Sequence, residues 1–80
     1  MKKHYYALFK RTGDAVEVEF PDLVGCSTFG KNWEEALLYA EDALAAWLVH
    51  ADPKFIKEPS THDELSHLGE LVPILVDQGL

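Results

Sequence analysis

HYYALFKRTGDAVEVEF, residues 4–20, decides the fold, because it reads as two strands joined by a tight turn. Residues 4–9 carry aromatic and apolar side chains on both alternating faces, which is typical of a strand covered on both sides. The turn residues Thr12-Gly13-Asp14 lead into a run that alternates apolar with other residues. In that run Val16, Val18 and Phe20 point one way, and Ala15, Glu17 and Glu19 point the other. The stretch therefore predicts a hairpin with one solvated face.

A third strand and a long helix are expected after the hairpin. Pro21-Asp22 breaks the second strand, and residues 25–30 read as a short third strand that completes an antiparallel meander. Asn32 is suited to cap the next helix, and Glu35 stands three residues later, where it can reach back as in a capping box. We therefore expect a helix that begins at Trp33.

This helix carries two separate sets of apolar residues. At about 100° per residue, the larger set gathers in one stripe that can cover the sheet. It consists of Trp33, Ala36, Leu37, Ala40, Leu44, Trp47, Leu48 and Ala51. A second set, Leu38, Ala45 and Val49, lies roughly 140° away, where the same sheet cannot bury it. Together with the small size of the chain, the second set predicts a homodimer or a larger even-numbered oligomer.

The rest of the chain predicts a short helix and a last strand. Pro53 and Pro59 bracket an irregular connector, after which Ser60 or Thr61 could cap a helix of one or two turns ending at Gly69. Residues 71–76, LVPILV, read as a strand that lies at an edge, because Pro73 cannot donate a hydrogen bond. The expected fold is α+β: a three-stranded antiparallel meander, a long helix packed on the sheet, a short helix and a final edge strand, all in a single domain, residues 1–80.

Charge and composition limit the classes of function. The 80-residue chain has 7 basic and 14 acidic side chains, a net charge of −7, which disfavours independent binding to nucleic acid. The first 11 residues have a charge of +4, from Lys2, Lys3, Lys10 and Arg11. The rest of the chain has a net charge of −11. The unpaired Cys26 and the absence of a signal-peptide pattern favour the cytoplasm, and no apolar run is long enough for a membrane span.

Three short motifs have simpler structural explanations. Residues 25–31 match the first seven positions of a phosphate-binding loop, but Asn32 lacks the hydroxyl of the eighth, and the surrounding meander is antiparallel. Cys26 has no histidine at an informative spacing, so we expect a small buried thiol rather than a nucleophile. His62 and His67 are five residues apart and lie on different sides of a helix. We therefore expect no catalytic residue, cofactor or metal.

The run FPDLVGCSTFG, residues 20–30, with the acidic helix start and the alanine series ending in AAWL, resembles the HicB family of antitoxins. The resemblance extends upstream to YYALF and downstream to EPSTHDEL and the closing LVPILVD, over nearly the whole chain. Its most specific positions are the Pro-Asp-Leu turn, Gly25, the Thr28-x-Gly30 exit and Glu35-Ala36. Val24 stands where the family commonly has proline.

The resemblance implies a partial RNase H-like fold that neutralises HicA, a small basic toxin that cleaves mRNA, without nuclease activity of its own. Members usually carry a C-terminal DNA-binding segment, whereas the sequence here stops at Leu80 directly after its last strand. It is therefore either a short member of the family or one domain of a longer protein, and we expect no direct DNA binding from these residues. Charge complementarity to a basic toxin points to Glu17, Glu19, Glu34 and Glu35 as the interface. The alternative is a regulatory or nucleic-acid-binding protein that uses Lys2, Lys3, Lys10 and Arg11 and has no toxin partner.

Overall fold

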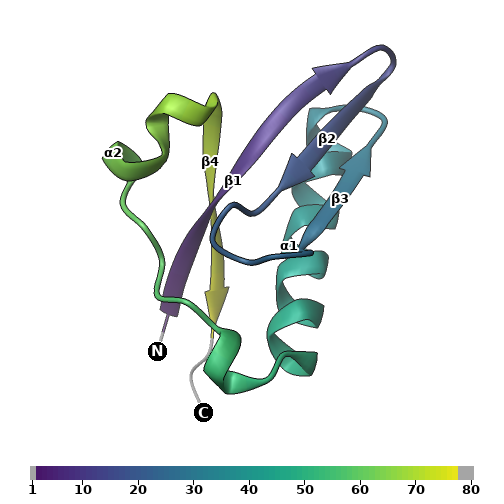
Figure 1. Cartoon of the computed structure of the whole chain (residues 1–80). Coiled ribbons are helices and arrows are strands. Elements are labelled where there is room, and N and C mark those ends of the chain that lie inside the picture. The colour runs from purple at the N-terminus through teal and green to yellow at the C-terminus, as the bar shows by residue number, and fades with distance from the viewer. Residues whose placement is uncertain (1, 78–80) are drawn as a thin grey trace.

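The centre of the fold is strand β1 (Lys2–Thr12), seen in a computed structural model that describes residues 2–77 (Figure 1). On one side β1 pairs with β2 (Ala15–Glu19), and on the other with β4 (Glu70–Asp77). The short strand β3 (Ser27–Gly30) pairs with the far side of β2, so the antiparallel sheet has the order β3-β2-β1-β4. The α+β fold is confirmed, and so is the edge position of the strand that contains Pro73.

The β1–β2 hairpin closes through two residues, Gly13 and Asp14. Gly13 has φ +58°, and no residue other than glycine among those described has positive φ. A two-residue loop with positive φ only at its first position is a type II′ turn, whose twist suits a hairpin and whose first position favours glycine.

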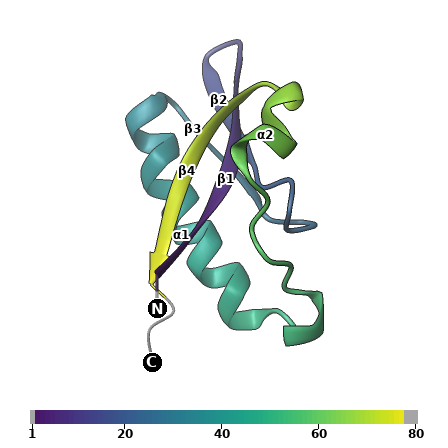
Figure 2. The ribbon, with the colours of Figure 1, turned by 90° about the vertical axis from the view of Figure 1, so that its left-hand side faces the viewer.

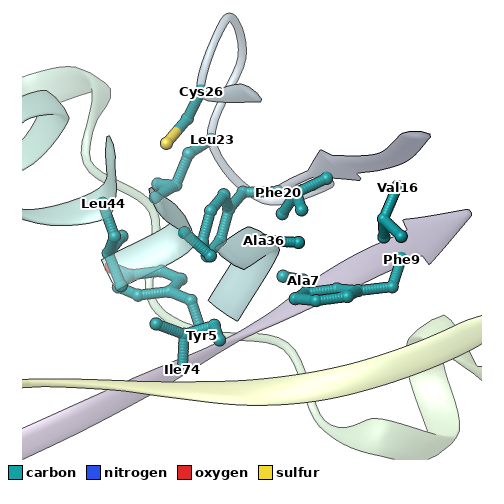
Figure 3. Packing of buried hydrophobic residues seen from close by; sticks show 12 residues of the cluster. Tyr5, Ala7, Phe9, Val16, Phe20, Leu23, Cys26, Ala36, Leu44 and Ile74 are labelled. Carbon is teal, nitrogen blue, oxygen red and sulfur yellow. The ribbon is translucent and has the colours of Figure 1, made fainter. Parts of the chain in front are cut away.

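Helix α1 (Trp33–His50) lies against one face of the sheet, which we call the inner face, and the core fills the space between them (Figure 3). Ala36, Ala40 and Leu44 are fully buried there. Small alanine side chains let the helix approach the sheet closely, and the large strand residues fill the remaining volume. The strands and the turn after β2 contribute Tyr5, Ala7, Phe9, Val16, Val18, Phe20, Leu23, Cys26 and Ile74. The predicted helix stripe is confirmed as far as Leu48, with Trp33, Leu37, Trp47 and Leu48 partly buried at its margins. Ala51, which was predicted to belong to it, is instead the residue that caps the end of α1 in extended conformation.

The predicted cap of α1 forms. The Glu35 amide donates to Asn32 Oδ1 at 2.8 Å, and Glu35 Oε1 accepts from the Lys31 amide at 3.0 Å. The carboxylate therefore satisfies the amide one residue before the cap rather than that of Asn32 itself, so this is a shifted version of the capping box.

We call the face of the sheet that is turned away from α1 the outer face. Short helical segments cover part of it (Figure 2). The connector contains the 3₁₀ turn η1 (Pro53–Phe55), and α2 (His62–Leu65) continues into the 3₁₀ turn η2 (Ser66–Leu68). Thr61 is the cap of α2, with a complete capping box to Glu64. Tyr6 lies on the outer face, and its ring meets the ring of His62 edge-on, with the two ring centroids 5.5 Å apart. One end of β1 is therefore covered on both sides, as its sequence predicts.

The boundaries of the strands differ from the prediction in two respects. Strands β1 and β4 are each longer than expected, because they pair with one another from Lys2–Asp77 to Phe9–Glu70, and β1 continues to Thr12 by pairing with β2. Strand β3 begins at Ser27 rather than Gly25, because Gly25 and Cys26 belong to the preceding turn.

Candidate functional site

Two successive turns, residues 20–26, join β2 to β3. The Leu23 amide donates to the Phe20 carbonyl and the Cys26 amide to the Leu23 carbonyl, each at 3.0 Å. Gly25 has φ +83°, and Val24 does not have positive φ, so the second turn is of type II. Val24 occupies its first central position, where proline is favoured, and is 91% exposed. The expected proline is thus absent from a position that tolerates other residues.

Asp22 fastens the first of these turns to the distant connector. Its Oδ2 accepts from the Ser60 amide at 2.7 Å, its Oδ1 accepts from Ser60 Oγ at 2.6 Å, and Lys57 Nζ lies 3.3 Å from Oδ1. Burial by itself would raise the pKa of this carboxyl, but the bonds from Ser60 and Lys57 outweigh it and hold the pKa below its ordinary value. Asp22 is therefore a buried carboxylate with a structural role.

Two further hydrogen bonds join the same region. The Tyr5 hydroxyl donates to the Lys57 carbonyl at 2.6 Å, and Trp47 Nε1 donates to the Val24 carbonyl at 3.1 Å. Burial, with the carboxylates of Glu58 and Asp22, raises the pKa of Tyr5, which keeps its hydroxyl protonated as a donor. Strand β1, the turns, the end of α1 and the connector are thus held as one unit.

Glu17 and Glu19 lie on the outer face of the sheet, at the end that α2 leaves open. Both are exposed, and the register places Glu17 between Lys10 on β1 and Phe29 on β3. A hollow of about 880 Å³ is lined there by residues of β1, β2 and β3, including both glutamates. Phe29 is 66% exposed beside them and was not among the predicted interface residues. Extending the alternation of the strands to residues 27–30 would have placed it on this face.

Glu34 and Glu35 lie on the opposite side of the molecule, in the first turn of α1. The four predicted interface carboxylates therefore do not form one surface, since the sheet separates the two pairs. The side chain of Glu35 is also engaged in the helix cap.

The residues predicted for self-association, Leu38, Ala45 and Val49, are all exposed on α1. The exposed fraction is 62% for Leu38 and 76% for Val49. They lie on the side of the helix that faces away from the sheet, as their spacing requires. Their exposure agrees with the sequence pattern, and the oligomer itself stays a prediction.

The basic residues of β1 do not form one patch. Lys10 is on the outer face, whereas the Arg11 guanidinium lies over the Trp33 ring on the inner face, 5.2 Å from its centroid. Lys2 and Lys3 belong to the far end of the same strand, about 23–27 Å from Lys10 at the usual rise per residue. This distribution does not favour the nucleic-acid alternative.

The motifs considered for nucleotide, thiol and metal chemistry have structural roles here. Residues 27–30 are a strand rather than a phosphate-binding loop. The Cys26 thiol is buried, lies 3.7 Å from the Ala43 carbonyl, and has its pKa raised to about 11 by burial, so it stays protonated at neutral pH. Among residues 2–77, no three His, Cys, Asp or Glu side chains are grouped closely enough to hold a metal ion. Within the same range, no helix is both long and apolar enough to cross a membrane.

Comparison with known proteins places this geometry in a family. No curated protein and no solved structure gives a significant match to the chain. A family model described as HicB_like antitoxin of bacterial toxin-antitoxin system matches residues 5–74. The matched range includes the turns at residues 20–26, both partners of the Asp22–Ser60 contact, and all of α1. The chain therefore belongs to the HicB-like antitoxin family of bacterial toxin-antitoxin systems.

Proposed function

We propose that this protein is an antitoxin that binds and neutralises a small, basic, mRNA-cleaving toxin of the HicA type in the cytoplasm, without catalysing a reaction itself. Membership in the HicB-like family is the observation that carries the proposal. The net charge of −7 supports it, since an acidic chain attracts a basic partner.

The acidic residues contribute mainly to the rate of association. Glu17 and Glu19 on the sheet and Glu34 on the helix are exposed, and opposite charge across an interface speeds encounter more reliably than it adds affinity. Added salt should therefore slow association, whereas dissociation, which depends on apolar contacts, should change little.

The test is neutralisation of any small, basic toxin of the HicA type that is encoded beside this chain. Co-expression should rescue growth of cells that produce the toxin, and the purified chain should bind the toxin in calorimetry. The double variant Glu17→Lys/Glu19→Lys tests the sheet pair and should slow association with the fold intact. Failure of the unaltered chain both to rescue growth and to bind would reject the antitoxin proposal and favour a regulatory protein without a toxin partner.

A further inference from the structure

The side of α1 that faces away from the sheet combines apolar and acidic residues in one row. Leu38, Asp42, Ala45 and Val49 follow one another at intervals of four, three and four residues, and Glu41 adjoins Leu38 and Ala45. All five are exposed. We call them the outer helix surface; Figure 2 shows that no described segment crosses the side of α1 turned away from the sheet.

The charge of this surface is not balanced within the described part of the chain. Helix α1 contains four carboxylates and neither Lys nor Arg. Among residues 2–77, no hydrogen bond or ion pair engages the side chain of Glu41 or Asp42. By contrast, the sheet pair is partly compensated, because Lys10 lies directly opposite Glu17. Of the two acidic regions, α1 has the greater uncompensated charge.

This charge disfavours a second copy of the chain as the occupant. In a twofold antiparallel pairing that brings Leu38 against Val49 of the other copy, the axis passes between residues 43 and 44. With helix axes about 8–10 Å apart, Glu41 and Asp42 from both copies would gather at the centre. Four carboxylates would then repel one another where the two copies contact most closely.

A basic partner fits the same row. Leu38 and Val49 are eleven residues apart, a separation of about 16 Å along the helix. The small side chain of Ala45 allows close approach between them, and the acidic pair lies alongside. A segment of the partner that fits this row would carry two apolar side chains about 16 Å apart, which is about three turns if the segment is a helix, with Lys or Arg between them.

We propose that the outer helix surface is the principal contact for the basic toxin, with Leu38 and Val49 as apolar anchors and Glu41 and Asp42 pairing with its Lys or Arg side chains. This inference rests on the proposed function. It assigns the close contact to the helix side of the molecule, and it leaves Glu17 and Glu19 on the sheet face to act at longer range on the rate of encounter.

A matched pair of leucine variants tests the assignment. Leu38 and Leu75 are 62% and 56% exposed, and Leu75 belongs to the edge strand β4. Leu38→Lys and Leu75→Lys change the net charge equally, so they differ only in position. Measured by calorimetry against the adjacent HicA-type toxin, Leu38→Lys should weaken binding by at least tenfold, and Leu75→Lys by less than about twofold. Thermal melts should show both variants folded.

Further measurements keep the outcome decisive. If Leu38→Lys does not fold, Val49→Lys replaces it, since Val49 is 76% exposed. The double variant Glu41→Gln/Asp42→Asn should slow association and flatten its dependence on salt. Equal loss of binding in the two leucine variants would overturn the assignment while leaving the antitoxin proposal intact. The assignment would also be overturned if the free chain formed a homodimer and the Leu38→Lys substitution dissociated it. Absence of binding by the unaltered chain would reject both.

Discussion

Asp22 illustrates what a single residue contributes and why its role was not predictable. In sequence it reads as part of a strand-breaking Pro-Asp pair, but its partner Ser60 stands thirty-eight positions later. Local pattern cannot indicate a hydrogen bond between two loops, so the sequence marked Asp22 only as a turn residue and did not predict its bond to Ser60. By contrast, Asn32 and Thr61 act within their own helices as caps, and their roles could be predicted.

Replacement of Asp22 by asparagine should lower the free energy of unfolding by about 2 kcal/mol at neutral pH, because hydrogen bonds to a buried charged group are lost. The folded-state pKa of Asp22 is lowered, so its stabilisation is complete above the unfolded pKa and is lost as pH falls through the folded pKa. The difference between unaltered chain and variant should therefore shrink under acid conditions. Urea titrations at several pH values measure it.

The exposed variant Asp42→Asn is the control for Asp22→Asn, since it should change stability little. An Asp22→Asn cost that does not vary with pH would contradict the role assigned to the ionised carboxylate.

At the level of elements, hydrophobic spacing predicted type and order correctly, because alternation and helical periodicity are local properties. The buried stripe of α1 and the polar face of β2 both follow from it. Strands β1 and β4 were predicted too short, since their length depends on pairing with neighbouring strands: with each other, and for the end of β1 with β2. The contact of β3 with α1 was also beyond local pattern: a Cβ placed on Gly30 would lie 2.5 Å from the Ala36 amide nitrogen.

Gly30→Ala should therefore destabilise the fold by about 1–3 kcal/mol or more, as overpacking does in a well-filled core. The close atoms belong to helix backbone, so no side-chain rotation can relieve the contact and α1 must shift as a body. Chemical denaturation measures the change. Ser27→Ala in the same strand is exposed and should be nearly neutral. A Gly30→Ala variant as stable as Ser27→Ala would show that α1 adjusts without loss.

At the scale of the whole molecule, charge and length indicated a small acidic binding protein, and the family resemblance identified the class. The sites were less accessible to sequence reasoning. Glu17, Glu19, Glu34 and Glu35 share a charge, but which side of the sheet each pair occupies depends on how α1 crosses it. Helical spacing already placed Leu38 and Val49 on the side of α1 away from the sheet, but only the structure shows that no other described segment covers that side.

Stability of the whole chain should not depend on a metal ion. The core is apolar, and α2, which begins at His62 and continues into the turn that contains His67, is held by the cap at Thr61 and the buried side chain of Leu65. Treatment with a chelator should therefore leave the melting temperature unchanged in calorimetry. A large decrease that zinc or manganese restores would contradict this, and His62→Ala would then show whether the short helix holds the ion.

The pairing of β1 with β4 has a consequence for the synthesis of the protein. Lys2 pairs with Asp77, so β1 can pair with β2 early in synthesis but gains its second neighbour only when β4 emerges from the ribosome. Until then one side of β1 has unpaired backbone groups, and Ile74 is missing from the core beside Tyr5. Without β4, the sheet keeps an open strand edge on β1, which is a target for chaperones and proteases. Pairing of β4 with β1 is therefore the step that closes the core during synthesis.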